Sequence, residues 1–142
     1  MKVAAKTEYA CLAILELAAR YGSGEPVRIR DIAEPHGIPA RFLVQILLQL
    51  KSAGLVNSTR GAAGGYQLVK SPEEITLGEV MAVIEGAETE PTSNLSDTTP
   101  TAHVLLDAWR KIADVHRQML ASITFAELAD QVRRTAEHMY YI

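Results

Sequence analysis

Cysteine is almost missing from this chain, which has only Cys11 among its 142 residues. A single thiol excludes an internal disulfide and any zinc or iron–sulfur site built from the cysteines of one chain. No apolar run reaches the roughly 18 residues that a membrane span needs, and residues 1–6 lack the apolar stretch of a signal peptide. We therefore expect a cytoplasmic protein without membrane contact.

A positive net charge is also missing, since the formal charge at pH 7 is −3. The distribution along the chain is uneven. Residues 1–70 carry nine Lys/Arg and five Asp/Glu, a net charge of +4, whereas residues 71–142 carry five and twelve, a net charge of −7. This asymmetry favours an electrostatic role for the first half, such as DNA binding. Chance segregation of charge on a solvated surface is the alternative.

The residue patterns of common enzymes are absent as well. We find no nucleophile–base pair, no metal triad and no nucleotide-binding fingerprint, and the glycines at 61–65 do not precede a helix. The four histidines show no metal-ligand spacing, although a site shared between two subunits stays open. Cys11 lies in an alanine- and leucine-rich segment that is typical of a core. We expect no enzyme, no cofactor and no metal site.

Apolar spacing and capping residues predict a mainly α-helical protein with one small β-hairpin, a winged helix-turn-helix followed by a long helix. The expected helices cover residues 7–20, 29–34, 39–52, 77–85, 102–123 and 124–137, and the expected strands cover 55–59 and 66–69. This pattern indicates a DNA-binding domain over 1–85, a flexible polar loop over 86–101, and a dimerisation helix with a C-terminal helix over 102–142.

The two helices before the hairpin have the order and lengths of a helix-turn-helix. In such a pair the second helix enters the major groove, and its first residues reach the base edges. Arg41, Gln45 and Gln49 are the expected base-contacting residues, while Phe42 is expected on the inner face with the leucines. Arg28, beside Arg30 at the start of the first helix, is expected to bind phosphate. A solvated helix face is the alternative.

The hairpin has a glycine-rich tip that begins with an arginine. Such a tip allows a close approach to the DNA backbone, and an arginine there can enter a narrow minor groove. The residues expected to contact DNA in this wing are Arg60, Gly61, Gly64, Gly65 and Tyr66.

Several segments together resemble the Rrf2 family of bacterial transcription regulators. They are residues 1–3 and 7–10, 42–47, 53–56, 60–68, 74–79, and 123–128 with Trp109. The most specific is Arg-Gly-x-x-Gly-Gly-Tyr at 60–66, placed directly after Ala-Gly-Leu-Val at 53–56. The resemblance implies a homodimer, formed through the helix at 102–123, that binds a pseudo-palindromic operator on double-stranded DNA, usually as a repressor. The expected dimerisation residues are Leu105, Trp109, Ile112 and Met119.

Two positions depart from the family pattern. Sensory members carry three cysteines before the long helix that bind an iron–sulfur cluster, but residues 88–103 contain none and offer only His103. Many members have an acidic residue before the glutamine of the second helix, where this chain has Val44. We therefore expect no iron–sulfur cluster and an operator of different sequence.

Two other functions remain compatible with the sequence. One is a protein-interaction module on a winged-helix scaffold, which the low net charge favours and the Arg60 wing opposes. The other is a DNA-binding regulator controlled by a partner protein or a small molecule.

Overall fold

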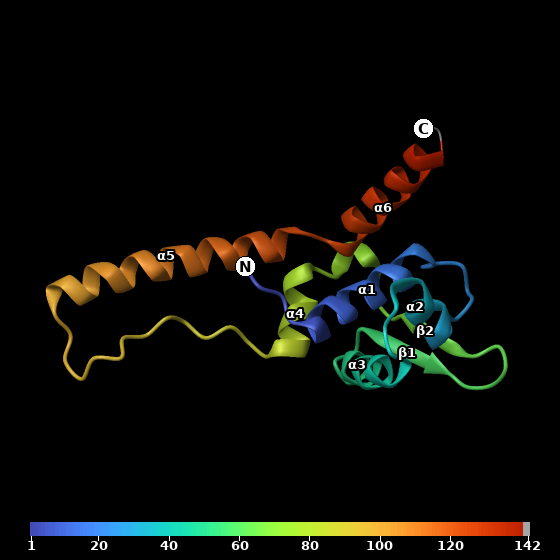
Figure 1. The fold of residues 1–142 in the computed structure, drawn as a ribbon, viewed down its shortest axis with the longest axis horizontal. Coiled ribbons are helices and arrows are strands. Elements are labelled where there is room, and N and C mark those ends of the chain that lie inside the picture. The colour runs from blue at the N-terminus through green and yellow to red at the C-terminus, as the bar shows by residue number, and fades with distance from the viewer. Residues whose placement is uncertain (141–142) are drawn as a thin grey trace.

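The structure is a computed structural model that describes residues 1–140. It confirms a mainly helical protein with one antiparallel hairpin (Figure 1). The elements are α1 (Ala5–Ala19), α2 (Ile29–His36), α3 (Ala40–Ser52), β1 (Val56–Thr59), β2 (Gly65–Leu68), the 3-10 turn η1 (Pro72–Glu74), α4 (Leu77–Glu85), α5 (Pro100–Ser122) and α6 (Phe125–Tyr140). Across residues 1–140, every helix falls short of the combination of length and hydrophobicity that crossing a membrane requires.

Helix α1 is the centre of the packed domain, because α2, α3, α4, α6 and β2 all contact it. Its fully buried side chains recur every three or four residues and are mostly small or aliphatic. Alanine at two of these positions lets neighbouring helices approach closely. The buried residues of α1 are Thr7, Ala10, Ala13, Ile14 and Leu17.

The turn between α2 and α3 is built on a glycine and a proline. Gly37 ends α2 in the left-handed conformation, with φ at +65°, and Pro39 caps the start of α3. The sequence predicted that α2 would end before Pro35, but the helix continues to His36. A proline in the last turn removes only one backbone hydrogen bond, so the true stop is Gly37.

The threonines of both predicted capping boxes cap their helices. The Thr76 hydroxyl accepts a hydrogen bond from the Glu79 amide at 3.1 Å, and the Thr124 hydroxyl accepts one from the Glu127 amide at 3.2 Å. Each hydroxyl satisfies one of the amides left unpaired at a helix start. Helix α5 begins at Pro100, two residues earlier than expected, because the Thr99 hydroxyl caps it.

The hairpin is attached to the segment between α1 and α2. Its strands pair in register from Val56 opposite Leu68 to Thr59 opposite Gly65. Val27 and Tyr66 then exchange two backbone hydrogen bonds, each of 2.8 Å. A Cβ atom at position 65 would lie 2.4 Å from the Val27 carbonyl oxygen, so only glycine allows this approach.

The chain after α5 returns to the same core. The Leu77 amide donates to the Ile123 carbonyl at 2.8 Å, and the Phe125 amide donates to the Ile75 carbonyl at 2.9 Å. Phe125 is fully buried. The core formed by residues 1–85 therefore includes the first residue of α6, and the C-terminal end of α5 is held on this domain.

Helix α5 and the segment before it form an arm that projects from the domain (Figure 1). The segment from Gly86 to Thr99 runs outward from α4, α5 returns beside it, and the two contact each other through polar groups. The Glu88 carboxylate lies 3.0 Å from His116 Nδ1, and the Arg110 Nε donates to the Pro91 carbonyl at 3.4 Å. These two contacts hold the segment against α5 at two places along the helix, at Arg110 and at His116.

The close approach at Gly65 leads to a stability prediction. Replacing Gly65 by alanine should lower the free energy of unfolding by about 1–3 kcal/mol beyond the backbone cost, because the new methyl collides with Val27. Gly24→Ala is the matched control, since φ there is also positive, at +77°, but no atom lies within 4 Å. Urea denaturation measures both. Equal losses in the two variants would contradict this contact.

Candidate nucleic-acid interface

Helix α3 has one buried and one exposed face. The side chains at 43, 46, 47 and 50 are at most 1% exposed, as the apolar spacing predicts. Arg41 and Gln45 are exposed and Gln49 is partly exposed, so these three predicted residues lie outside the core. Their polar groups are free to contact a ligand without disturbing the packing of α3.

Phe42 is not on the inner face, so this part of the prediction was wrong. Its side chain is 48% exposed, and the Arg41 guanidinium carbon lies 5.0 Å from the centre of its ring. Leu43 fills the core side of the first turn of α3. Successive side chains of an α-helix differ in direction by about 100°, so Phe42 points away from the core. Leu48, further along α3, is also exposed, at 47%.

The hairpin tip carries an arginine and is held by a hydrogen bond from a residue outside the hairpin. Arg60 and Gly61 are exposed at the tip. Arg28, predicted to bind phosphate, donates a hydrogen bond from its guanidinium to the Ala62 carbonyl. This bond joins the residue before α2 to the tip, so Arg28 holds the wing in position.

Two of the predicted wing glycines face the protein's own backbone. A Cβ at Gly64 would lie 2.2 Å from the Thr59 carbonyl oxygen, and Gly65 is equally crowded by Val27. Gly61, with φ at +105°, has open space around it. Gly64 and Gly65 therefore set the shape of the hairpin, while Arg60, Gly61, Ala62 and Ala63 form the exposed surface of the tip.

A contact that the sequence did not reveal joins α3 to the hairpin. The Lys51 ammonium donates to the Ser58 hydroxyl at 2.8 Å. The bond forms only because β1 turns back beside the end of α3, so neither helical nor strand spacing predicts it. The hairpin is thus held near α2 by Arg28 and near α3 by Lys51.

Positive charge on this side of the domain is not neutralised by the chain itself. No Asp or Glu occurs between Glu34 and Glu73. None of the ion pairs found over residues 1–140 involves Arg28, Arg41, Lys51 or Arg60. We call the exposed side of α3 and the hairpin tip, with Arg41, Gln45, Gln49 and Arg60, the recognition surface. Its unpaired cations favour an anionic partner.

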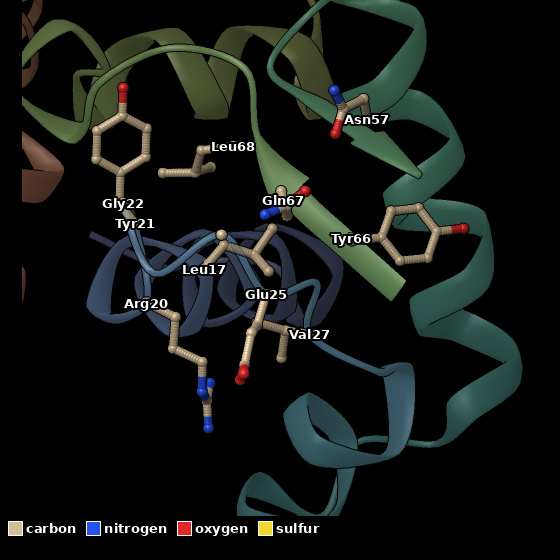
Figure 2. Close-up of a pocket in the computed structure, with 11 residues that line it drawn as sticks. Leu17, Arg20, Tyr21, Gly22, Glu25, Val27, Asn57, Tyr66, Gln67 and Leu68 are labelled. Carbon is tan, nitrogen blue, oxygen red and sulfur yellow. The ribbon is translucent and has the colours of Figure 1, made fainter. Parts of the chain in front are cut away.

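The surface of the domain is hollowed near the end of α1 and beside α3. One hollow, of about 330 Å³, lies between the end of α1 and β2. Figure 2 shows Arg20 and Tyr21 pointing away from each other and Tyr66 pointing away from both. The other, of about 440 Å³, is a shallow groove beside α3, lined by Gln45, Leu48, Gln49, Ser52, Ala53 and Val83. The groove belongs to the recognition surface.

A second exposed surface runs along α5 and is apolar. The four residues predicted for dimerisation are all half exposed or more, at 50% for Leu105, 51% for Trp109, 67% for Ile112 and 58% for Met119. Their spacing of three, four or seven residues puts them on one side of the helix. We call these four residues the α5 stripe. Apolar side chains in a continuous row mark a protein contact surface.

Comparison with known proteins identifies the family. The Rrf2 family, described as "Iron-dependent Transcriptional regulator", matches residues 3–131. The chain belongs to the Rrf2 family. The regulator CymR of Bacillus subtilis (strain 168) is 36% identical over 143 residues, covering 100% of both chains. IscR of Escherichia coli O1:K1 / APEC is 35% identical over 132 residues, covering 92% of this chain and 81% of IscR.

Solved structures of the same regulators match the fold. CymR, described as the global cysteine regulator of B. subtilis, superposes with a TM-score of 0.80 at 35% identity, covering 92% of this chain and 98% of CymR. IscR of T. potens has a TM-score of 0.75 at 33% identity, covering 93% of this chain and 88% of IscR. This chain is therefore a helix-turn-helix transcriptional regulator that binds DNA, and it is not an enzyme.

The iron dependence in the family description does not fit the donor set of this chain. An iron–sulfur cluster requires several thiolates, and the sole thiol, Cys11, lies in α1 rather than before α5. His103, at the place expected for a ligand, lies 3.5 Å from the Asp107 carboxylate. Among residues 1–140, no three His, Cys, Asp or Glu side chains are placed to hold a metal ion.

The environment of Cys11 predicts an unreactive thiol. Burial, together with the nearby Glu85 charge, raises the pKa of Cys11 from 9.0 to about 11. At pH 8 the folded chain should therefore hold about a hundredfold less thiolate than the unfolded chain. Iodoacetamide labelling, followed by mass spectrometry, should be correspondingly slower without urea than with it. Labelling should accelerate as the pH rises toward 11, whereas equal rates at pH 8 would contradict this environment.

Proposed function

We propose that this Rrf2-family chain is a sequence-specific repressor that binds a pseudo-palindromic operator as a homodimer in the cytoplasm. The observation that carries the proposal is the recognition surface, where exposed polar side chains of α3 and an arginine-tipped hairpin come from a stretch of sequence, residues 35–72, that contains no Asp or Glu. A helix for the major groove and a cationic wing for the backbone are the two parts that such binding needs.

The exposed face of α3 supplies the base contacts in this proposal. Arg41 has the donor geometry for O6 and N7 of guanine, and Gln45 has the donor and acceptor that match adenine. Gln49, partly exposed one turn further, extends the same face toward the groove beside α4.

The wing supplies the contacts outside the major groove. Arg60 enters the minor groove, and Gly61 leaves room for the DNA backbone beside it. Gly64, Gly65 and Tyr66 act indirectly, because Gly64 lets the tip fold back on Thr59 while Gly65 and Tyr66 fix the hairpin against Val27. Arg28 likewise acts through its hydrogen bond to the tip, in addition to its charge.

The α5 stripe supplies the dimer contact. A two-fold pair of stripes buries Leu105, Trp109, Ile112 and Met119 against the same residues of a second copy. Two recognition surfaces related by two-fold symmetry require an operator with matching two-fold symmetry. A dimer bound across a promoter blocks RNA polymerase, which makes repression its simplest action.

The signal in this proposal is a small molecule or a partner protein that changes the dimer's affinity for the operator. The donor set of the chain supports this choice, because one partly buried thiol cannot hold the cluster of the sensory members. The unpaired cations of the recognition surface support DNA over a protein as the main partner.

Selection of bound DNA from a random pool, followed by anisotropy titration, tests the DNA contacts. Gln45→Ala should change preference at one base pair per half-site by about 1–3 kcal/mol, while Arg60→Ala should weaken binding to all sequences and reduce the salt dependence. Arg133→Ala, which removes an exposed arginine from α6, is the matched control and should bind normally. Equal affinity of the native protein for selected and random DNA at every salt concentration would exclude sequence-specific binding.

A charge placed in the α5 stripe tests the dimer. Ile112→Asp should give a folded monomer in sedimentation, with operator affinity lowered at least tenfold, because burying an unpaired carboxylate is costly. Gln118→Asp adds the same charge to an exposed polar position of α5 outside the stripe and should stay dimeric. A dimeric Ile112→Asp variant would show that the subunits associate elsewhere.

A further inference from the structure

We infer that Phe42 contacts the C5-methyl group of a thymine beside the guanine that Arg41 binds, taking the proposed DNA binding as given. The first turn of α3 then recognises a two-base step containing thymine and guanine. The proposed function assigns Arg41 and Gln45 to bases, and this inference adds a residue that selects thymine through an apolar contact.

The exposure of Phe42 leaves its ring available to a partner. The ring is 48% exposed in a helix whose core face is complete without it. An exposed aromatic ring contributes its burial energy only when another molecule covers it. In Figure 1, α3 lies away from the arm formed by α5, so Phe42 is not part of the α5 stripe.

The position of Phe42 in α3 identifies what covers it. Phe42 is the third residue of the helix, directly after Arg41 and one turn before Gln45. The N-terminal residues of a recognition helix are the ones that reach base edges. On the major-groove edge of the four bases, the thymine methyl is the only apolar group. An apolar ring at this place therefore selects thymine.

The contact between Phe42 and Arg41 couples their two targets. The Arg41 guanidinium carbon lies 5.0 Å from the centre of the Phe42 ring, within the range of a cation–π interaction. No carboxylate of residues 1–140 competes for Arg41. Stacking restricts both side chains before DNA arrives and lowers the entropy lost on binding. A guanine contact by Arg41 then brings the Phe42 ring to the neighbouring base.

Replacing thymine by uracil tests the contact, because it removes the methyl group and leaves base pairing unchanged. Each thymine of the selected operator is replaced in turn, and the Kd is measured by anisotropy for the native protein and for Phe42→Ala. Replacing one particular thymine in each half-site should lower the affinity of the native protein about fourfold, the value expected for one buried methyl group. That thymine should adjoin a guanine, and its replacement should have no effect on Phe42→Ala.

The controls separate a lost contact from a lost fold. Tyr21→Ala removes an aromatic ring that is also half exposed, at 49%, from the turn after α1, and it should respond to uracil as the native protein does. Phe42→Leu keeps an apolar side chain without the cation–π stack, so it should keep the methyl response and lose affinity at the adjoining guanine. Circular dichroism should give the same helical content for all variants.

Each outcome has a distinct meaning. If the native protein prefers its operator but no thymine shows a loss that depends on Phe42, the methyl contact is excluded and the proposed function stands. If the responsive thymine does not adjoin a guanine, the inferred thymine–guanine step is excluded, and the proposed function again stands. If the native protein shows no operator preference at all, both the proposed function and the Phe42 contact are excluded.

Discussion

Two hydrogen bonds between the backbones of Val27 and Tyr66 join the helix-turn-helix to the wing. They place the segment leading into α2 beside the hairpin, and Gly65 makes the approach possible because it has no side chain. Arg28 and Lys51 add side-chain bonds to the hairpin from either side. The helix pair and the wing are consequently held together, which fixes the distance between the proposed major-groove and minor-groove contacts.

The helices were predictable because their apolar residues and caps are local signals. The inner face of α3, with leucine or isoleucine at 43, 46, 47 and 50, follows from spacing alone. The exposure of Phe42 does not follow from spacing. Helical spacing gives the direction in which a side chain points, but it does not show whether a neighbouring element covers that side of the helix. The same limit applies to Gly64 and Gly65, whose crowding comes from chain segments that meet only after folding.

The exposure of the proposed recognition residues was predicted from sequence more completely than the contacts that support the recognition surface. Arg41, Gln45 and Arg60 are exposed where the motif places them. The bonds from Arg28 to Ala62 and from Lys51 to Ser58 join residues far apart or on different elements, and no periodicity signals such pairs. The return of Phe125 to the core is also a tertiary event, which the capping box at Thr124 locates but does not explain.

The tie between Ile75 and Phe125 has a consequence for the geometry of the operator. It anchors the end of a 23-residue helix to the reading domain, and such a helix is about 35 Å long. One turn of B-DNA measures about 34–36 Å. In a dimer built on α5, the length of this helix therefore sets the distance between the two reading domains. The angle at which the two copies of α5 cross then sets the number of base pairs between half-sites. A change in that angle alone would lower the affinity of the dimer for its operator, even if the side chains proposed to contact bases kept their positions within each domain.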